Sequence, residues 1–384
     1  MTLRFSIDHF CANLPKYAGT SRLGLITNPS GVDSKLTSTI DRLHETGRLV
    51  ALYGPEHGVR GHFQAGEKVQ TYDDPQTGLP VFSLYGDVRK PTREMLVGVD
   101  ALVIDLQDVG CRFYTYLYTL LYALEAAREF DLPIFVLDRP NPLGGEIVEG
   151  NLLEKEYTSF VGYPIPIRYG LTIGEMALYF NTIFEIKAEL TVVPLEGWSR
   201  ADYQIERKMT WVPTSPNVPK VDTVFVYPGT CLVEGTNLSE GRGTALPFET
   251  VGAPFINGDR LAGVLNALDL PGVRFRPTSF KPTFSKHAGE QCQGVQIHVS
   301  DRVTYKPVQT GVRLIETVAK LYDQFEFLKP PAGARHYFFD LLAGSDQMRK
   351  LIDANQPLDE MFFQWEIQQK EFRAQSERFM LYKS

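Results

Sequence analysis

Residues 49–61 of this 384-residue chain read Leu-Val-Ala-Leu-Tyr-Gly-Pro-Glu-His-Gly-Val-Arg-Gly. The apolar run at 49–53 predicts a buried strand, and Gly54-Pro55 predicts its end, because proline cannot continue a central strand. Glu56 and His57 then follow at the strand's carboxyl end, which is where open α/β sheets bind ligands. We interpret this loop as part of a site. A turn that merely carries charged residues is the alternative.

Other apolar runs with the same character predict strands at 22–27, 101–106 and 133–137, with helices at 38–46, 91–97 and 116–130 between them. This alternation predicts a doubly wound, mostly parallel sheet with helices on both faces. Right-handed crossovers bring the carboxyl ends of such strands to one edge. We therefore expect one cleft to collect the polar residues at these ends, which are Asn28, Glu56, His57, Asp105, Asp108, Asp138 and Arg139.

A second glycine-rich polar loop spans residues 231–244 and carries Glu234, Asn237, Glu240 and Arg242. It matches neither the Walker loop nor the dinucleotide-binding fingerprint. After it the pattern changes to strands at 273–280 and 294–299, followed by helices from 308 onward. We therefore predict a domain boundary between residues 244 and 254, which separates a catalytic domain (1–247) from a smaller α+β domain (248–384).

Composition excludes several classes of function. The net charge is −7 without a Lys/Arg cluster, which argues against a nucleic-acid partner. The chain has no apolar run of eighteen or more residues, so we expect no membrane span. Its four cysteines form no Cys-x-x-Cys pair, which favours free thiols in a reducing compartment. Asp8 and His9 interrupt the first ten residues before an export signal can form, so we expect a cytoplasmic protein.

Carboxylates are the candidates for acid–base chemistry. Glu56 is the first choice for a general acid, a general base or a nucleophile, since burial at a sheet edge can raise its pKa toward the working pH. Its alternative role is to cap backbone amides of its own loop. Asp108, Glu234 and Glu240 are candidates for a second carboxylate. Asp105 lies inside an apolar strand, where a carboxylate needs a partner, so an anchor for the Glu56 loop is as good an interpretation as direct catalysis.

Other residues of these loops could bind a metal ion, an anion or a sugar face. His57, His62, Glu67, Asp73 and Asp74 could hold a metal, but their spacing is not the His-Glu-x-x-His pattern, so we predict neither metal nor cofactor. An arginine can hold an anionic group through bidentate hydrogen bonds from its guanidinium, although most arginines form ion pairs on the surface instead. The arginines considered are Arg60, Arg112, Arg168 and Arg242, and the aromatic residues that could stack on a sugar are Tyr114, Tyr116 and Trp198.

Four motifs taken together resemble the exo-β-N-acetylmuramidase family. They begin at Gly54 (Gly-Pro-Glu-His-Gly-x-Arg-Gly), Asp105 (Asp-Leu-Gln-Asp-Val-Gly-x-Arg-Phe-Tyr-Thr-Tyr), Asp138 (Asp-Arg-Pro-Asn-Pro) and Glu234 (Glu-Gly-Thr-Asn-x-Ser-x-Gly-Arg-Gly-Thr). The resemblance implies a Rossmann-like N-terminal domain, a smaller C-terminal domain and a site in the cleft between them. It also implies release of N-acetylmuramic acid from the non-reducing end of cell-wall fragments, so the expected partner is a muramyl glycan or disaccharide.

Carried onto this sequence, the resemblance makes Glu56 the matching carboxylate of the first motif, and Asp108 or Glu234 could be the second. The other motif residues are expected to line the site, namely His57, Arg60, Asp105, Arg112, Tyr114, Asp138, Arg139, Asn141, Asn237, Glu240 and Arg242. Arg60 ranks first and Arg242 second for holding the lactyl carboxylate of muramic acid. Relatives are often exported, a feature that this sequence does not show.

The chemistry leaves alternatives open. Glycoside cleavage uses two protein carboxyl groups, or one with the acetamido oxygen of the substrate as the nucleophile. A metal-dependent hydrolase using His57 and His62 and a non-catalytic glycan-binding protein are the two rival interpretations.

Overall fold

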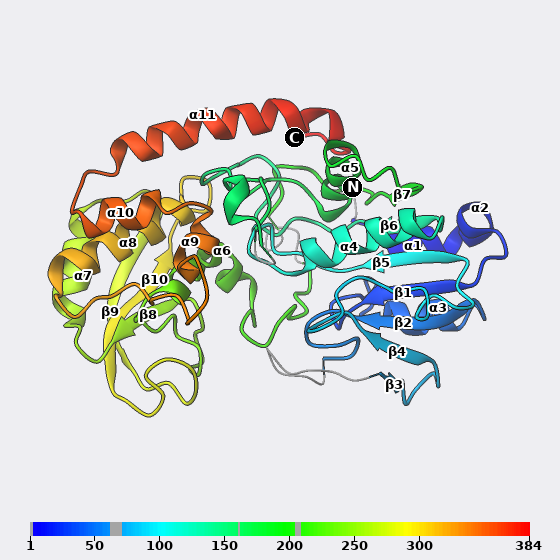
Figure 1. Cartoon of the computed structure of the whole chain (residues 1–384), viewed down its shortest axis with the longest axis horizontal. Coiled ribbons are helices and arrows are strands. Elements are labelled where there is room, and N and C mark those ends of the chain that lie inside the picture. Colours follow the sequence, from blue (N-terminus) through cyan, green and yellow to red (C-terminus); the bar gives the residue numbers. More distant parts are fainter. Residues whose placement is uncertain (1–2, 62–70, 160–161, 204–208) are drawn as a thin grey trace.

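The computed structural model describes residues 3–61, 71–159, 162–203 and 209–384. Its larger sheet has seven strands in the order β3-β4-β2-β1-β5-β6-β7, and all neighbours pair in parallel except β3 and β4 (Figure 1). The strands are β1 (Leu23–Thr27), β2 (Leu49–Gly54), β3 (Tyr72–Asp73), β4 (Pro80–Ser83), β5 (Ala101–Asp105), β6 (Ile134–Leu137) and β7 (Leu190–Val193).

Helices cover both faces of this sheet, which confirms the predicted doubly wound α/β fold. They are α1 (Ser6–Ala12), α2 (Leu14–Ala18), α3 (Thr39–His44), α4 (Tyr116–Glu129) and α5 (Ile173–Ile183). Strand β1 pairs with β2 on one side and β5 on the other, so the chain reverses its winding direction between β1 and β5. Such a reversal is the topological switch point at which open α/β folds bind ligands.

Local sequence explains where most of these elements begin. Thr172 and Glu175 form the reciprocal capping box that opens α5, because each side chain accepts a hydrogen bond from the other residue's backbone amide. Strands β1, β5 and β6 are buried along their whole length, as a sheet covered on both faces requires. A helix was also predicted at 91–97, but the structure has turns there, so that prediction was wrong.

The smaller domain is built on an antiparallel sheet in the order β8-β10-β9. Its strands are β8 (Thr250–Ala253), β9 (Val273–Phe280) and β10 (Cys292–Val299), and its helices include α7 (Gly258–Ala267), α8 (Pro307–Leu321), α9 (Phe338–Ala343) and α10 (Gln347–Asp353). Helix α6 (Val221–Thr230) packs against α8 and β10 although it precedes the predicted boundary. We therefore propose that the second domain begins at α6.

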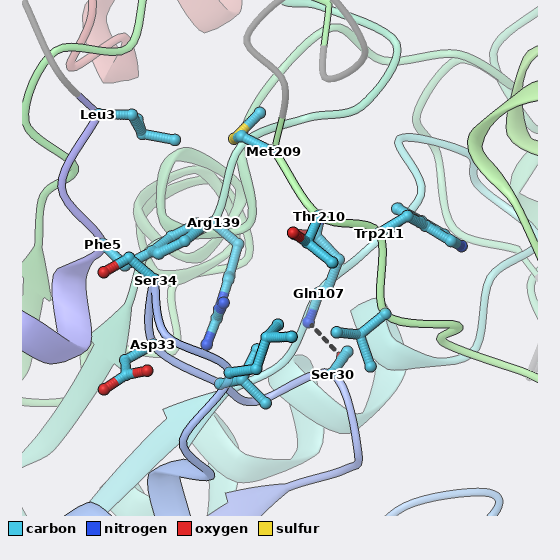
Figure 2. Close-up of a pocket in the computed structure, with 13 residues that line it drawn as sticks. Leu3, Phe5, Ser30, Asp33, Ser34, Gln107, Arg139, Met209, Thr210 and Trp211 are labelled. Atoms are coloured by element: carbon cyan, nitrogen blue, oxygen red, sulfur yellow. Dashed lines mark hydrogen bonds between the residues drawn. The ribbon is translucent and has the colours of Figure 1, made fainter.

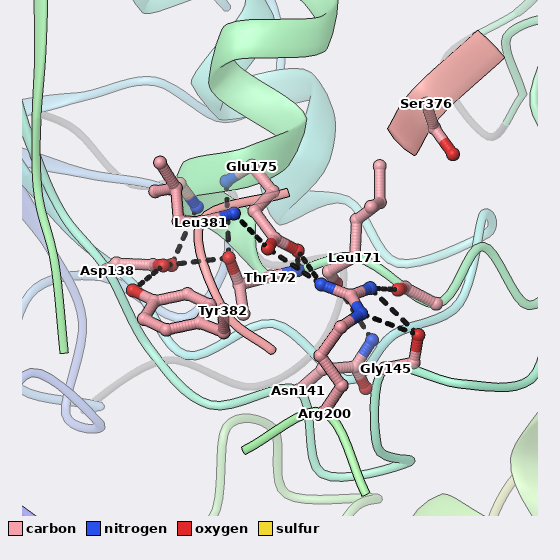
Figure 3. A network of polar contacts seen from close by, with 12 residues as sticks. Asp138, Asn141, Gly145, Leu171, Thr172, Glu175, Arg200, Ser376, Leu381 and Tyr382 are labelled. Carbon is pink, nitrogen blue, oxygen red and sulfur yellow. Dashed lines mark hydrogen bonds and ion pairs between the residues drawn. The ribbon is translucent and has the colours of Figure 1, made fainter. Parts of the chain in front are cut away.

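The last helix, α11 (Asp359–Ser376), runs from the smaller domain back over the larger one (Figure 1). The chain end beyond it then joins a buried polar network of the larger domain (Figure 3). Tyr382 donates a hydrogen bond to Asp138 at 2.5 Å, and the backbone amide of Leu381 donates to Glu175 at 2.8 Å. Glu175 also pairs with the buried Arg200 at 2.7 Å. The carboxyl terminus thus fastens the two domains together.

Among the described residues, no helix is both long and apolar enough to cross a membrane. The cytoplasmic location stays a prediction.

Candidate active site

A small pocket of about 80 Å³ lies where the two domains meet at the carboxyl edge of the large sheet. Its floor comes from the loops after β2 and β5, and its far wall comes from α6 and the loop that follows it. The lining residues are Glu56, His57, Phe113, Tyr114, Thr115, Tyr116, Ser215, Asn217, Tyr227 and Arg242. Segments far apart in sequence therefore converge here, as the strand ends predict.

Glu56 is positioned by a backbone that has little room to move. His57 and Gly58 both adopt positive φ values, 76° and 72°, and a Cβ on Gly54 would lie 3.1 Å from the Cα of Gly58. The hydroxyl of Thr115, at the start of α4, donates to Glu56 Oε2 at 3.2 Å. A rigid turn and one hydrogen bond thus present this half-buried carboxylate to the pocket.

The phenol of Tyr85 is the other group on Glu56. Burial and, after it, the neighbouring Glu56 carboxylate together raise the pKa of Tyr85 to about 12. Tyr85 therefore stays protonated and can donate a hydrogen bond to Glu56.

Arg242 enters the pocket from the far wall as part of a partly buried charge cluster. Its Nη1 contacts Glu234 Oε1 at 3.0 Å and Glu240 Oε1 at 3.1 Å, while Lys286 contacts Glu240 Oε2 at 3.0 Å. Burial raises the pKa of Glu234, although Arg242 opposes this shift. Burial also opposes ionisation of Glu240, but Lys286 and Arg242 outweigh it and hold that pKa below its usual range. The two cations and two carboxyl groups thus form one connected cluster at the pocket wall.

Lys286 was not predicted from the sequence. It lies in the connection between β9 and β10 and has no motif around it, yet its ammonium also donates to the carbonyls of Val233 and Thr236, each at 2.9 Å. The adjacent His287 contacts the carbonyl of Asn237 at 2.7 Å. This hairpin loop therefore holds the 231–244 loop in place.

Tyrosines form the sides of the pocket. The hydroxyl of Tyr114 forms a hydrogen bond with the side-chain hydroxyl of Thr214 at 2.5 Å. The hydroxyl of Tyr116 donates to the backbone carbonyl of Thr214 at 2.6 Å. The ring of Tyr114 meets that of Tyr227 edge-on, with centroids 6.0 Å apart. The segment that carries Thr214, Ser215 and Asn217 was also missed, because it is irregular chain without a recognisable motif.

Several predicted site residues lie outside this pocket and are engaged in the fold. Asp105 is fully buried and pairs with Arg139 through two hydrogen bonds of 2.6 and 2.7 Å, so it anchors the chain after β6 rather than the Glu56 loop. The side chain of Asn141 donates to the backbone carbonyl of Leu171 and accepts from the backbone amide of Leu143. Asn28 lies behind the pocket, where it accepts hydrogen bonds from Ser30 and contacts Tyr116.

Two arginines of the motifs also have structural partners. Arg60 pairs with Asp74 at 2.6 Å and with Asp41 at 3.2 Å, and it does not line the pocket. Arg112 is fully buried and donates to four backbone carbonyls, two of them in α9 at Leu342 and Ala343. It therefore joins the two domains. Asn237, on the loop after α6, donates from its side chain to the carbonyl of Gln324 and accepts from the amide of Glu326.

Asp108 is buried beneath the pocket and does not line it. It accepts hydrogen bonds from the hydroxyl of Tyr169 and from the amide of Gly110 at 2.7 Å, and its Oδ1 has no partner among the described residues. Burial raises the pKa of Asp108 from 3.8 to about 6. This environment keeps the carboxyl group protonated up to about pH 6, and its hydrogen bonds hold the loop after β5.

The raised pKa of Asp108 predicts a pH dependence of stability. The folded state keeps the proton up to about pH 6, whereas the unfolded state loses it near 3.8, so the stability contributed by this group is lost as the pH rises between these values. We expect this loss to be roughly 3 kcal/mol. The Asp108→Asn variant should not show this loss of stability with rising pH. Urea unfolding at pH 4.5 and 7 should show about 2 kcal/mol of this loss in wild type and none of it in Asp108→Asn, and an equal change in the two proteins would contradict the prediction.

The fold and the pocket together define a two-domain α/β protein whose interdomain site presents one carboxylate, tyrosine rings and an arginine. Two adjoining family models match it, the N-terminal part of exo-β-N-acetylmuramidase NamZ over residues 23–222 and the C-terminal part over 225–382. The chain therefore belongs to the exo-β-N-acetylmuramidase NamZ family. The two models meet at the start of α6, which supports the domain boundary proposed above.

Individual proteins are similar over nearly the whole chain. The peptidoglycan β-N-acetylmuramidase NamZ of Bacillus subtilis strain 168 is 49% identical over 380 residues, which cover 98% of this chain and 90% of that protein. Two crystal structures of DUF1343 family proteins from Bacteroides fragilis also match. One has a TM-score of 0.90 at 40% identity over 99% of both chains, and the other has 0.80 at 30% identity over 100% of both.

Proposed function

We infer that this protein is a glycoside hydrolase that releases N-acetylmuramic acid from the non-reducing end of peptidoglycan fragments. The observation that carries this inference is the interdomain pocket, in which Glu56 faces tyrosines and Arg242, within a chain similar over 98% of its length to a peptidoglycan β-N-acetylmuramidase. Glu56 is proposed as the acid that protonates the leaving oxygen. Incubation with a defined muramyl disaccharide, followed by mass spectrometry, tests the activity.

The second catalytic group is proposed to be the substrate's own acetamido oxygen. Among the described residues that line the pocket, Glu56 is the one carboxylate, while Asp108 lies beneath it and Glu234 pairs with Arg242. The acetamido oxygen would bond to C1 as the bond from C1 to the leaving oxygen breaks and Glu56 gives that oxygen its proton. Water would then attack C1, open the ring intermediate and return a proton to Glu56.

This mechanism predicts a product with retained configuration. Two displacements at C1 restore the β-anomer, whereas direct attack by water would give the α-anomer. Proton NMR of the first minutes of hydrolysis distinguishes the two anomers before they equilibrate. A trifluoroacetamido substrate, whose carbonyl oxygen is a weaker nucleophile, should react roughly tenfold or more slowly. Initial formation of the α-anomer would exclude the proposal.

Activity is expected to survive removal of metal ions. No group of three or more His, Cys, Asp or Glu suited to a metal occurs among the described residues, and His62 and Glu67 lie outside them. Hydrolysis should proceed at an unchanged rate after prolonged dialysis against a chelator. If activity is lost and one added divalent ion restores it, the metal-dependent alternative replaces this mechanism.

A further inference from the structure

A second cavity, of about 200 Å³, lies at the topological switch point of the large sheet (Figure 2). Ser30 follows β1, Gln107 follows β5 and Arg139 follows β6, and all three line it. The chain at Phe5 and at residues 209–212 closes it from outside. This cavity shares no lining residue with the pocket that holds Glu56, although both lie at the carboxyl edge where ligands bind in such folds.

The charged groups of this cavity are already compensated. Arg139 is paired with Asp105, and its guanidinium carbon lies 5.1 Å from the centre of the Phe5 ring. Asp33 accepts hydrogen bonds from the amides of Lys35 and Thr37 and pairs with Arg42. The cavity therefore presents no unbalanced charge, and an anionic or cationic ligand would have no counter-ion there.

Its polar groups are instead suited to a neutral ligand. Gln107 is buried, and its side chain is fixed by donation from Nε2 to the carbonyls of Asp108 and Pro140, both at 2.8 Å, so its Oε1 is held in one direction. No described residue donates to that oxygen. The hydroxyl of Thr210 lies on the same lining, near the apolar ring of Phe5, whereas the Ser30 hydroxyl is engaged in the fold by Asn28 and the amide of Gln107. Hydroxyl and amide groups next to a flat apolar face are what a sugar ring binds.

One segment connects this cavity to the active-site pocket. Residues 209–212 line the cavity, whereas Ser215 and Asn217 line the pocket, and Thr214 between them is held by Tyr114 and Tyr116. Val212 and Ser215 are three positions apart, so at most roughly 10 Å of chain separates the two linings. Asn28 makes a second link, since it hydrogen-bonds Ser30 of the cavity and contacts Tyr116 of the pocket, so the two linings are neighbours.

We propose that the switch-point cavity binds a neutral pyranose sugar beside the catalytic pocket. The proposal rests on the function proposed above for the identity of the sugar, which is the N-acetylglucosamine that alternates with muramic acid in peptidoglycan. It has two possible sources, the leaving-group side of the substrate or the free sugar after release. The volume of the cavity is that of roughly six or seven water molecules, which is room for one sugar ring.

Filling the cavity tests this proposal. Ser34 lines the cavity and is exposed, whereas its neighbour Lys35 is equally exposed and does not line it. Ser34→Trp is therefore the occluding variant, Lys35→Trp is its matched control, and Thr210→Trp occludes the cavity from the opposite wall. Each protein is assayed with the muramyl–glucosaminyl disaccharide and with a chromogenic aryl muramide, which lacks the second sugar. Calorimetry with free N-acetylglucosamine measures binding directly.

Both occluding variants should weaken N-acetylglucosamine binding about tenfold or more while Lys35→Trp binds as wild type. If the leaving-group sugar is the source, KM for the disaccharide rises about tenfold and the aryl muramide is unaffected. If the released sugar is the source, the occluding variants keep the wild-type KM for both substrates. Added N-acetylglucosamine then changes the rate of aryl muramide hydrolysis by wild type but not by the occluding variants. Unchanged binding, or an equal loss on both substrates, would overturn the proposal. Sugar binding without hydrolysis by wild type would refute the proposed function but not this site.

Discussion

Glu56→Gln is expected to reduce turnover of a muramyl substrate by roughly 10² or more, because the amide keeps the shape of the side chain but cannot transfer a proton. The surrounding structure should tolerate the change. Thr115 donates to Oε2, and the amide oxygen can accept that hydrogen bond in its place. Steady-state kinetics on the disaccharide and the aryl muramide measure the effect.

Comparison of the two substrates sharpens this test. A general acid matters most for a poor leaving group, so the disaccharide should lose more activity than an aryl muramide whose phenolate leaves without a proton. Glu45→Gln, at an exposed position on the same domain, is the matched control and should behave as wild type. Wild-type turnover by a folded Glu56→Gln protein would remove Glu56 from the mechanism.

Arg242→Leu should cost roughly 2–5 kcal/mol in kcat/KM against a muramide and far less against the matching glucosaminide. The muramide carries a lactyl carboxylate, and a buried anion requires a charged partner. Arg242 lines the pocket, and both of its ion pairs use Nη1, so its other guanidinium nitrogens can meet the substrate. Arg60 was ranked first from the sequence, but its guanidinium is paired with Asp74 and Asp41 away from the pocket, so we propose Arg242 instead.

Loss of Arg242 also leaves Glu234 and Glu240 without their partner, so the folding of the variant must be measured separately. Thermal unfolding shows whether the fold is intact, and inhibition by free N-acetylmuramic acid and free N-acetylglucosamine isolates binding from catalysis. Arg242→Lys keeps the charge and should restore part of the preference for the muramyl sugar. An equal loss of both activities and both affinities would assign Arg242 to the fold or the transition state.

The strands and their ends could be predicted because parallel buried strands leave a strong local signal. The apolar run before Glu56 was sufficient to place that residue at the carboxyl edge, where the structure has it. Helix α6 left no such signal. All of its residues except Asp222 are buried and Pro228 lies inside it, so the helical alternation of apolar and polar positions is absent.

The roles of charged residues were harder to predict, because a sequence shows a charge but not its partner. Asp105 ends β5, Arg139 follows the neighbouring β6, and the two form a buried pair that removes both from the active-site pocket. Arg112 looks like an anion-binding residue in its motif, yet backbone carbonyls from both domains surround it. Lys286 reaches its partners from a distant hairpin, so only the folded chain reveals it.

Product analysis of muramyl–glucosaminyl oligosaccharides with defined ends is the most direct test of the central claim. Mass spectrometry over time should show N-acetylmuramic acid released one unit at a time from the non-reducing end, with wild-type protein but not with Glu56→Gln. Internal cleavage, release of N-acetylglucosamine first, or undiminished release by the variant would contradict the assignment of Glu56 to an exo-acting muramidase site.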